Sequence, residues 1–177
     1  HALTLGPEVI KGVVRTLSDI ESPVATEMLI SLLDKGDSAL DVIKAVGKQK
    51  AFPAFEPLSK LVLQDPWTPV RIEALEALLE IDRDQALPFV IAALGAEEHE
   101  ELRHTAIARL ASFKKTDCRT RVYYELICGE YGFIQHNPLQ AFPFIKDAAG
   151  SGPEVRSGIP KALSYIDVRG KLHRSFW

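Results

Sequence analysis

Residues 70–81 read VRIEALEALLEI, and this stretch decides the fold. Counted from Val70 as position zero, a set of apolar side chains stands at offsets 4, 5, 8 and 11, which are Ala74, Leu75, Leu78 and Ile81. In a helix with about 3.6 residues per turn, these offsets place all of them on one face. The spacing therefore predicts an amphipathic helix over 70–81 whose apolar face must be covered by another element.

The same pattern returns along the chain. Further copies begin at Val9, Ser38, Leu102 and Val155, so that successive starts are 29, 32, 32 and 53 residues apart. The second copy departs from the pattern at offset 11, where it has the polar Gln49. The fifth copy contains Pro160, which should kink its helix or show that the copy begins later. Self-similarity at a period of this size is typical of stacked helical units, so each copy is interpreted as one helix of a repeating pair.

The segments between the copies provide the second helix of each pair. The stretches 23–33, 53–63, 88–94 and 143–149 each begin with proline and carry an apolar stripe of their own. Because proline is tolerated in a first helical turn, each stretch is predicted to be the first helix of a pair. We therefore predict an all-α fold, an α-solenoid of about five helical hairpins that forms a single domain over residues 1–177.

Three short motifs carry a resemblance to a known family. In each, an acidic residue of the turn accompanies a hydrophobic residue and an arginine that open the second helix: Asp65 with Val70-Arg71, Glu98 with Leu102-Arg103, and Gly152-Pro153-Glu154-Val155-Arg156. This pattern resembles the HEAT-repeat family, particularly its bacterial subtype with PBS-lyase-like repeats, and implies HEAT-like hairpins. The resemblance also implies that Arg71, Arg103 and Arg156 form a structural ladder. The ladder is incomplete early in the chain, where Ile10 and Ala39 replace the arginine.

The long last interval contains an extra segment at about 114–137. Within it, 117–130 is predicted to be a helix whose Val122, Leu126 and Ile127 pack inward, and 131–137 is predicted to be a loop. The segment is either a functional insertion that presents arginines and tyrosines to a partner or a degenerate repeat with its tyrosines in the core. The C-terminal tail, at about 168–177, follows the last repeat as a cap or a docking segment.

Charge is distributed unevenly along the chain. The net charge is −3, but residues 1–100 hold 9 Lys and Arg against 17 Asp and Glu, and residues 101–177 hold 12 against 7. In the resembled family the second helices line the concave face, where side chains off the apolar stripe are exposed. Candidate partner-binding residues on these helices and on the extra segment are Arg15, Lys44, Lys48, Glu73, Glu76, Glu80, His104, Arg109, Arg119, Arg121, Tyr124, Lys161 and Tyr165.

No residue set requires catalysis or a cofactor. The densest cluster of metal-ligating residue types is Glu97, Glu98, His99, Glu100, Glu101 and His104. It resembles the His-Glu motifs of deoxyhypusine hydroxylase, a HEAT-like iron enzyme, but such an enzyme needs pairs on several repeats and the other repeats have none. We therefore expect no catalytic residues, no metal and no cofactor.

The main functional hypothesis is a non-catalytic scaffold or adaptor that binds a protein or peptide. The alternative, by resemblance, is a nucleic-acid-binding or catalytic HEAT-like protein, similar to the alkylpurine DNA glycosylases or the chromophore lyases. The basic C-terminal part favours the alternative, and the acidic residues Glu73, Glu76 and Glu80 oppose it. No apolar run is long enough to cross a bilayer, so no membrane partner is expected. Cys118 and Cys128 are too far apart on one helix for a disulfide, which favours the cytoplasm.

Overall fold

The computed structural model describes residues 7–20, 22–33, 39–113 and 117–166. These residues form helices joined by short turns, and no β-strand occurs in these four ranges. The all-α fold class is therefore confirmed. The chain divides into two compact units, His1–Phe89 and Val90–Trp177, and each is described by itself below. The single domain expected over the whole chain stays a prediction.

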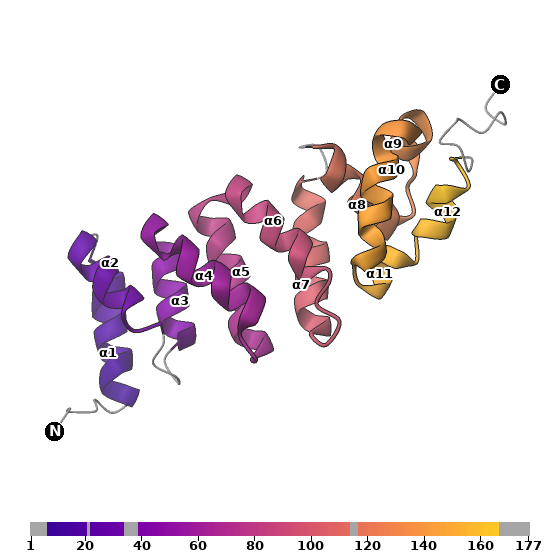
Figure 1. Cartoon of the computed structure of the whole chain (residues 1–177). Coiled ribbons are helices and arrows are strands. Elements are labelled where there is room, and N and C mark those ends of the chain that lie inside the picture. The colour runs from indigo at the N-terminus through magenta and orange to yellow at the C-terminus, as the bar shows by residue number, and fades with distance from the viewer. Residues whose placement is uncertain (1–6, 21, 34–38, 114–116, 167–177) are drawn as a thin grey trace. The chain divides into compact units, whose positions relative to one another are not determined.

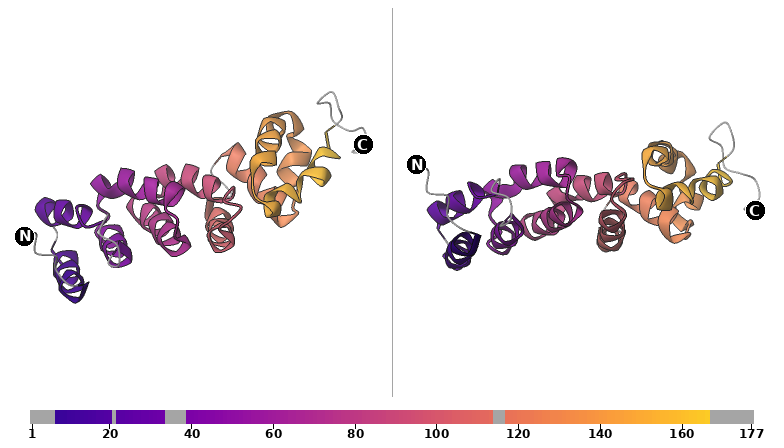
Figure 2. Two further views of the ribbon diagram at one scale, coloured as in Figure 1. Left: turned by 60° about the horizontal axis from the view of Figure 1, so that its bottom comes forward. Right: turned by 90° about the horizontal axis from the view of Figure 1, so that it is seen from below.

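Unit 1 consists of two rows of helices. Its helices are α1 (Pro7–Ser18), α2 (Pro23–Ile30), α3 (Ala39–Lys48), the 3-10 turn η2 (Phe52–Ala54), α4 (Phe55–Gln64), α5 (Thr68–Ile81) and the beginning of α6 (Arg83–Ala93). Figures 1 and 2 show α1, α3 and α5 side by side in one row, with α2 and α4 in the other. The copies of the repeated pattern thus form the row of second helices, as the spacing predicts.

The repeated apolar stripe forms the core of unit 1. The pattern positions without exposed surface are Val42, Ile43 and Val46 on α3 and Ala74, Leu75 and Leu78 on α5. At the first copy only Val14 is buried, while Val9 is 51% exposed. The difference follows from position in the row, because α3 has a second helix on each side and α1 contacts only α3 in that row.

A glycine sets the spacing between α3 and α5. A Cβ atom added at Gly47 would lie 2.9 Å from the Cβ of Ala77, closer than side-chain carbons pack. The absence of a side chain at Gly47 therefore allows the two helix backbones to approach each other.

Two of the four prolines that were predicted to begin a helix lie inside a helix instead. Pro88 and Pro143 lie inside α6 and α10 (Pro138–Asp147), which both begin five residues earlier than predicted. Each proline leaves the carbonyl four residues before it without a donor, but both prolines are on exposed faces, where water can hydrate that carbonyl. The stretch 53–63 begins as η2 before α4, and only α2 begins at its proline as predicted.

Unit 2 is centred on α8 (Cys118–Cys128), which contacts α7 (Glu100–Leu110) and α10. The remaining elements are η3 (Ala111–Phe113), α9 (Gly132–His136), η4 (Ala148–Gly150), α11 (Pro153–Arg156) and α12 (Ile159–Leu163). The pattern positions Leu102, Ala106, Leu110 and Phe113 are buried here as predicted, while Ile107 is half-buried. No helix in the described part of either unit is long and apolar enough to span a bilayer.

The fifth copy of the pattern is not one continuous helix, and the break lies next to Pro160, where the sequence predicts a kink or a later start. The chain forms α11, turns at Ser157 and Gly158, and continues as α12, in which Leu163 is 41% exposed. A Cβ at Gly158 would collide with the backbone carbonyl oxygen of Leu126, so α8 and this turn are in direct backbone contact. Pro160 also has no N–H to continue the hydrogen bonding of α11.

The helix expected at 117–130 is confirmed as α8. Its N-cap is Asp117, whose carboxylate accepts hydrogen bonds from the Thr120 amide at 3.0 Å and the Thr120 hydroxyl at 2.6 Å. The C-cap is Gly129 in the left-handed conformation, with φ of 72°. Val122 and Leu126 are buried, and Ile127 is half-buried. The loop expected at 131–137 was wrong in part, because it contains α9. The tail at 168–177 and residues 114–116 lie outside the described residues.

Candidate functional site

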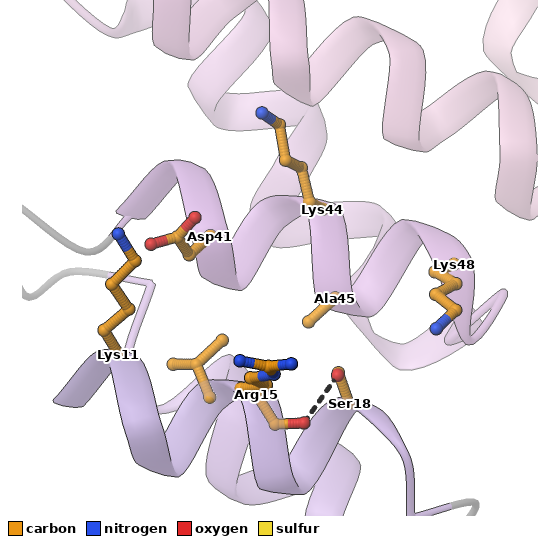
Figure 3. Close-up of a pocket in the computed structure, with 8 residues that line it drawn as sticks. Lys11, Arg15, Ser18, Asp41, Lys44, Ala45 and Lys48 are labelled. Atoms are coloured by element: carbon orange, nitrogen blue, oxygen red, sulfur yellow. Dashed lines mark hydrogen bonds between the residues drawn. The ribbon is translucent and has the colours of Figure 1, made fainter. Parts of the chain in front are cut away.

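The row of second helices in unit 1 contains a hollow between α1 and α3. Its volume is about 260 Å³. Figure 3 shows that residues of both helices line it, with the Arg15 head group lying between the two helices. The lining residues are Lys11, Val14, Arg15, Ser18, Asp41, Lys44, Ala45 and Lys48. Four cationic side chains and one carboxylate therefore surround this hollow.

The helical period explains this composition. Lys11 and Arg15 are four residues apart on α1, as are Lys44 and Lys48 on α3, so each pair projects from one helix face. Val14 and Ala45 belong to the inward faces and are 3% and 5% exposed. The result is a groove with an apolar floor and cationic rims, which we call the α1–α3 groove.

Two of the four cations have acidic neighbours. The Lys44 ammonium lies 3.7 Å from Glu73 on α5, and the Lys48 ammonium lies 3.7 Å from Asp19 at the end of α1. Figure 3 shows Lys44 pointing away from α1. Both lysines are well exposed, so these ion pairs are weak and screened by salt. Among the described residues, Lys11 and Arg15 have no carboxylate within ion-pairing distance.

The next helix of the row has the opposite charge. Glu73, Glu76 and Glu80 follow one another at helical spacing on α5, and Glu80 reaches back to the α3 backbone at Gly47. The structure thus places six of the candidate residues in unit 1, with Arg15, Lys44 and Lys48 on α1 and α3 and the glutamates on α5. This surface is basic on one side and acidic on the other.

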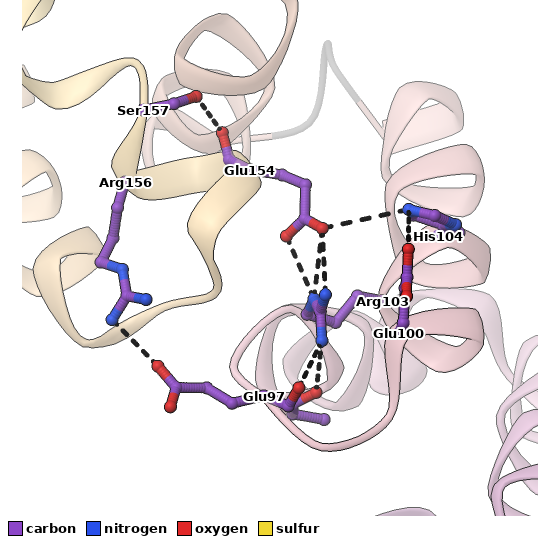
Figure 4. A network of polar contacts seen from close by, with 8 residues as sticks. Glu97, Glu100, Arg103, His104, Glu154, Arg156 and Ser157 are labelled. Atoms are coloured by element: carbon purple, nitrogen blue, oxygen red, sulfur yellow. Dashed lines mark hydrogen bonds and ion pairs between the residues drawn. The ribbon is translucent and has the colours of Figure 1, made fainter.

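A polar network holds α11 against α7 in unit 2 (Figure 4). The Arg103 side chain is 8% exposed and donates through Nε to Glu154 Oε2 at 3.1 Å and through Nη2 to Oε1 at 3.2 Å. Its Nη1 donates to the carbonyl oxygens of Ala96 at 3.1 Å and Glu97 at 2.7 Å, after the end of α6. Burial raises the pKa of Glu154, but hydrogen bonds and charge from Arg103 outweigh it, so this pKa is lowered.

The other two arginines of the expected ladder make different contacts. Arg71 donates through Nε to the Val62 carbonyl at 2.6 Å, near the C-terminus of α4, and through Nη2 to the Leu63 carbonyl at 3.3 Å. Burial lowers the pKa of Arg71, and Asp65 partly opposes this effect. Arg156 forms an exposed ion pair at 2.9 Å with Glu97. Only Arg103 therefore combines carbonyl capping with a carboxylate partner among these contacts.

The candidates on α7, α8 and α12 do not form one site. The Arg119 guanidinium lies 5.7 Å from the ring centroid of Tyr123, and that of Arg121 lies 4.9 Å from the ring centroid of Phe133. Tyr124 shares a hydrogen bond with Cys128 on the following turn. These side chains are occupied with neighbours from their own unit.

Three further candidates lie at other positions of unit 2. The His104 ring lies 3.9 Å from both Glu100 and Glu154. Arg109 is exposed in the last turn of α7. Lys161 lies 5.5 Å from the ring centroid of Tyr165, whose ring lies 5.7 Å from that of Tyr131.

Two polar residues that the sequence left without a role have structural partners. Gln49 donates to the carbonyls of Leu17, Ser18 and Ile20 at 2.8, 3.3 and 3.1 Å, and so caps the C-terminus of α1. Buried Glu125 accepts from the amides of Phe133 at 2.6 Å and Ile134 at 2.9 Å, and so caps α9. The signal for Gln49 is visible in the sequence, since it is polar at an apolar pattern position. The sequence shows no such signal for Glu125.

The acidic and histidine-containing stretch at the start of α7 is not gathered into a metal site. Within the described ranges, no three His, Cys, Asp or Glu side chains lie close enough together to hold an ion. Cys118 and Cys128, at the two ends of α8, are free thiols.

These observations define an all-α protein of stacked helical hairpins with a charged surface on its second helices. A family model of HEAT repeats matches residues 55–122, which extend from α4 into α8. The match assigns HEAT repeats to this stretch of the chain, as the resemblance implied. Comparison with curated proteins and with solved structures found no match.

Proposed function

We propose that this HEAT-repeat chain is a non-catalytic scaffold or adaptor module that binds a protein or peptide partner through the second helices of unit 1. HEAT repeats generally mediate protein interactions. The observation that carries the proposal is the surface of α1, α3 and α5, where a groove with cationic rims lies beside the acidic row Glu73, Glu76 and Glu80. A surface with a positively charged region beside a negatively charged one selects partners by charge complementarity.

The contacts in unit 2 support unit 1 as the binding region. Arg103 is buried, Arg119 and Arg121 lie over aromatic rings, and His104 lies near two carboxylates. These contacts stabilise the fold of unit 2 and compete with any partner. Because Arg103 is buried and paired with Glu154, it is not available to bind a phosphate, which argues against a nucleic-acid role.

Affinity capture with charge variants tests the proposal. The double variant E76K/E80K reverses charge on the α5 surface, while K60E on α4 reverses an exposed charge in the other row of the same unit. We expect the wild-type chain and K60E to capture the same proteins, identified by mass spectrometry, and E76K/E80K to lose some of them. Identical captured sets for all three would contradict a binding role for α5.

We also propose a reducing compartment, the cytoplasm. Cys118 and Cys128 are free, and Cys128 is exposed. Exposed thiols persist where the surroundings keep them reduced. Labelling of both thiols in intact cells before lysis tests this assignment.

A further inference from the structure

We propose that the α1–α3 groove binds an extended, glutamate-rich segment of a partner protein, with carboxylates at alternate positions. This inference rests on the proposed binding function and names the chemistry of the partner. It is carried by the spacing of the cations, by the apolar floor and by the charges on the neighbouring helix.

The spacing of the cations matches an extended chain. Lys11 and Arg15 are four residues apart on α1, and Lys44 and Lys48 repeat this separation on α3, which corresponds to about 6 Å along each helix axis. Side chains on the same side of an extended peptide are about 6.6 Å apart. Carboxylates at positions i and i+2 of a partner segment therefore fall opposite Lys11 and Arg15, while Lys44 and Lys48 also have Glu73 and Asp19 as neighbours.

The length of the groove limits the segment. Its lining extends from Lys11 to Ser18, which is about 10 Å along α1. About three extended residues cover this distance. The groove therefore recognises a short motif rather than a long polyanion.

The floor favours glutamate over smaller anions. Val14 and Ala45 form an apolar base below the charged rims. The two methylene groups of a glutamate can cover these side chains while the carboxylate reaches the cations on the rim. Aspartate has a shorter stem and covers less of this surface.

The arginine in the groove is not needed to cap its own helix. Gln49 already donates to the last carbonyls of α1, at Leu17, Ser18 and Ile20. Figure 3 shows the Arg15 guanidinium between the two helices. A guanidinium in this place can donate two parallel hydrogen bonds to one carboxylate.

Acidic side chains in the lining and on α5 limit how far an anion can extend beyond the cations. Asp41 lies in the lining on the α3 side, and Glu73 on α5 lies 3.7 Å from Lys44. A nucleic-acid backbone that continued beyond the groove would meet these carboxylates and the rest of the acidic row. The charge pattern therefore favours a short acidic peptide.

Fluorescence anisotropy with a defined probe tests this inference. The probe is the labelled peptide Gly-Ser-Glu-Leu-Glu-Leu-Glu-Ser-Gly, and its control has glutamine in place of each glutamate. We expect the wild-type chain to bind the acidic probe in preference to the control, with an affinity that falls as salt screens the charges. The double variant K11E/R15E should weaken binding by about tenfold or more, because it replaces attraction by repulsion.

Two further variants distinguish a loss of binding from a loss of folding. K11Q/R15Q removes both charges without adding acid and should weaken binding less than K11E/R15E. K60E, on the other row, should bind like the wild-type chain. Circular dichroism of each variant reports whether the helices are kept.

The outcomes separate this inference from the proposed function. Equal binding of the two peptides, or an unchanged affinity in folded K11E/R15E, would overturn the acidic-segment proposal. If E76K/E80K still loses captured partners in that case, the module function stands without this groove. Binding of an oligothymidine that K11E/R15E abolishes, with no binding of the peptide, would assign the groove to nucleic acid and would also overturn the proposal.

Discussion

The α3–α5 contact of unit 1 is made by apolar side chains and a glycine, whereas α7 and α11 of unit 2 are joined through buried Arg103 and its partner Glu154. The first contact depends on volume, because a close-packed interface tolerates neither a cavity nor an added methyl group. The second depends on pairing, because a buried charge without its partner is costly. The same family of hairpins is thus held together by two different kinds of interaction.

The largest effect is expected from truncating the shared apolar stripe. Leu78→Ala in unit 1 and Leu110→Ala in unit 2 should each lower the free energy of unfolding by about 2 to 5 kcal/mol, because both side chains are fully buried. Urea denaturation measures the change. Leu63→Ala is the matched control, since Leu63 is 46% exposed and should change stability by about 0.5 kcal/mol or less. A change near zero at Leu78 would mean that the stripe does not form the core.

The second-largest effect is expected from replacing the buried Arg103, which should destabilise unit 2. Arg103→Met removes the ion pair with Glu154 and leaves two capped carbonyls without their donor. We expect a loss of about 2 to 3 kcal/mol, less than for a fully buried pair because Glu154 is partly exposed. Hydrogen exchange should rise in α7 and α11. Arg156→Met, which removes an exposed ion pair, should lower the free energy of unfolding by about 1 kcal/mol or less. Equal losses in Arg103→Met and Arg156→Met would mean that the burial of Arg103 does not strengthen its contribution.

A pair of glycines tests the volume-dependent contact. Gly47→Ala should lower the free energy of unfolding by about 1 to 3 kcal/mol, because the new methyl group meets Ala77. Gly12→Ala on α1 adds the same group in open space and should raise it by about 0.4 to 1 kcal/mol. Thermal unfolding of the two variants gives opposite shifts if the α3–α5 contact is tight. Shifts of the same sign would disprove that interpretation.

The smallest expected effect is a dependence on pH. The pKa of Glu154 is lower in the folded chain than its ordinary value of 4.5. The charged form of Glu154 therefore stabilises the fold at pH values above about 4.5. This contribution is lost as the pH falls below about 4.5 and through the folded pKa. Urea titrations between about pH 6 and pH 3 should show a smaller decline for Glu154→Gln than for the wild-type chain. An identical decline would exclude Glu154 as a source of the acid sensitivity.

The sequence predicts the regular part of this molecule well. The stripes in α3, α5 and α7 and the helix after Asp117 follow from local spacing and capping residues, and the structure contains all four helices. The α1–α3 groove can be anticipated in part, because Lys11, Arg15, Lys44 and Lys48 lie off the stripe at four-residue intervals. The hollow itself could not be predicted, because it depends on how far apart α1 and α3 pack.

The failures occur where distant segments determine local structure. Prolines 88 and 143 were predicted to start helices, but the exposure of their faces decides whether a helix can continue through them. The fifth copy has the pattern residues Ile159, Pro160, Leu163 and Ile166 after Val155, but the turn at Gly158 packs against the backbone of α8 and divides the copy into α11 and α12.

By itself, the sequence determined the all-helical class, the repeat and the face that each second helix buries, because these depend on the spacing of apolar residues a few positions apart. The tertiary structure decided which polar residues connect one segment to another: Gln49 caps α1, Glu125 caps α9, and Arg103 pairs with Glu154. In each case a side chain satisfies groups from another segment of the chain. The sequence marks Gln49 as polar at an apolar pattern position and Arg103 as part of the arginine motif, but not the groups that they bind. Those partners meet only after the helices have packed.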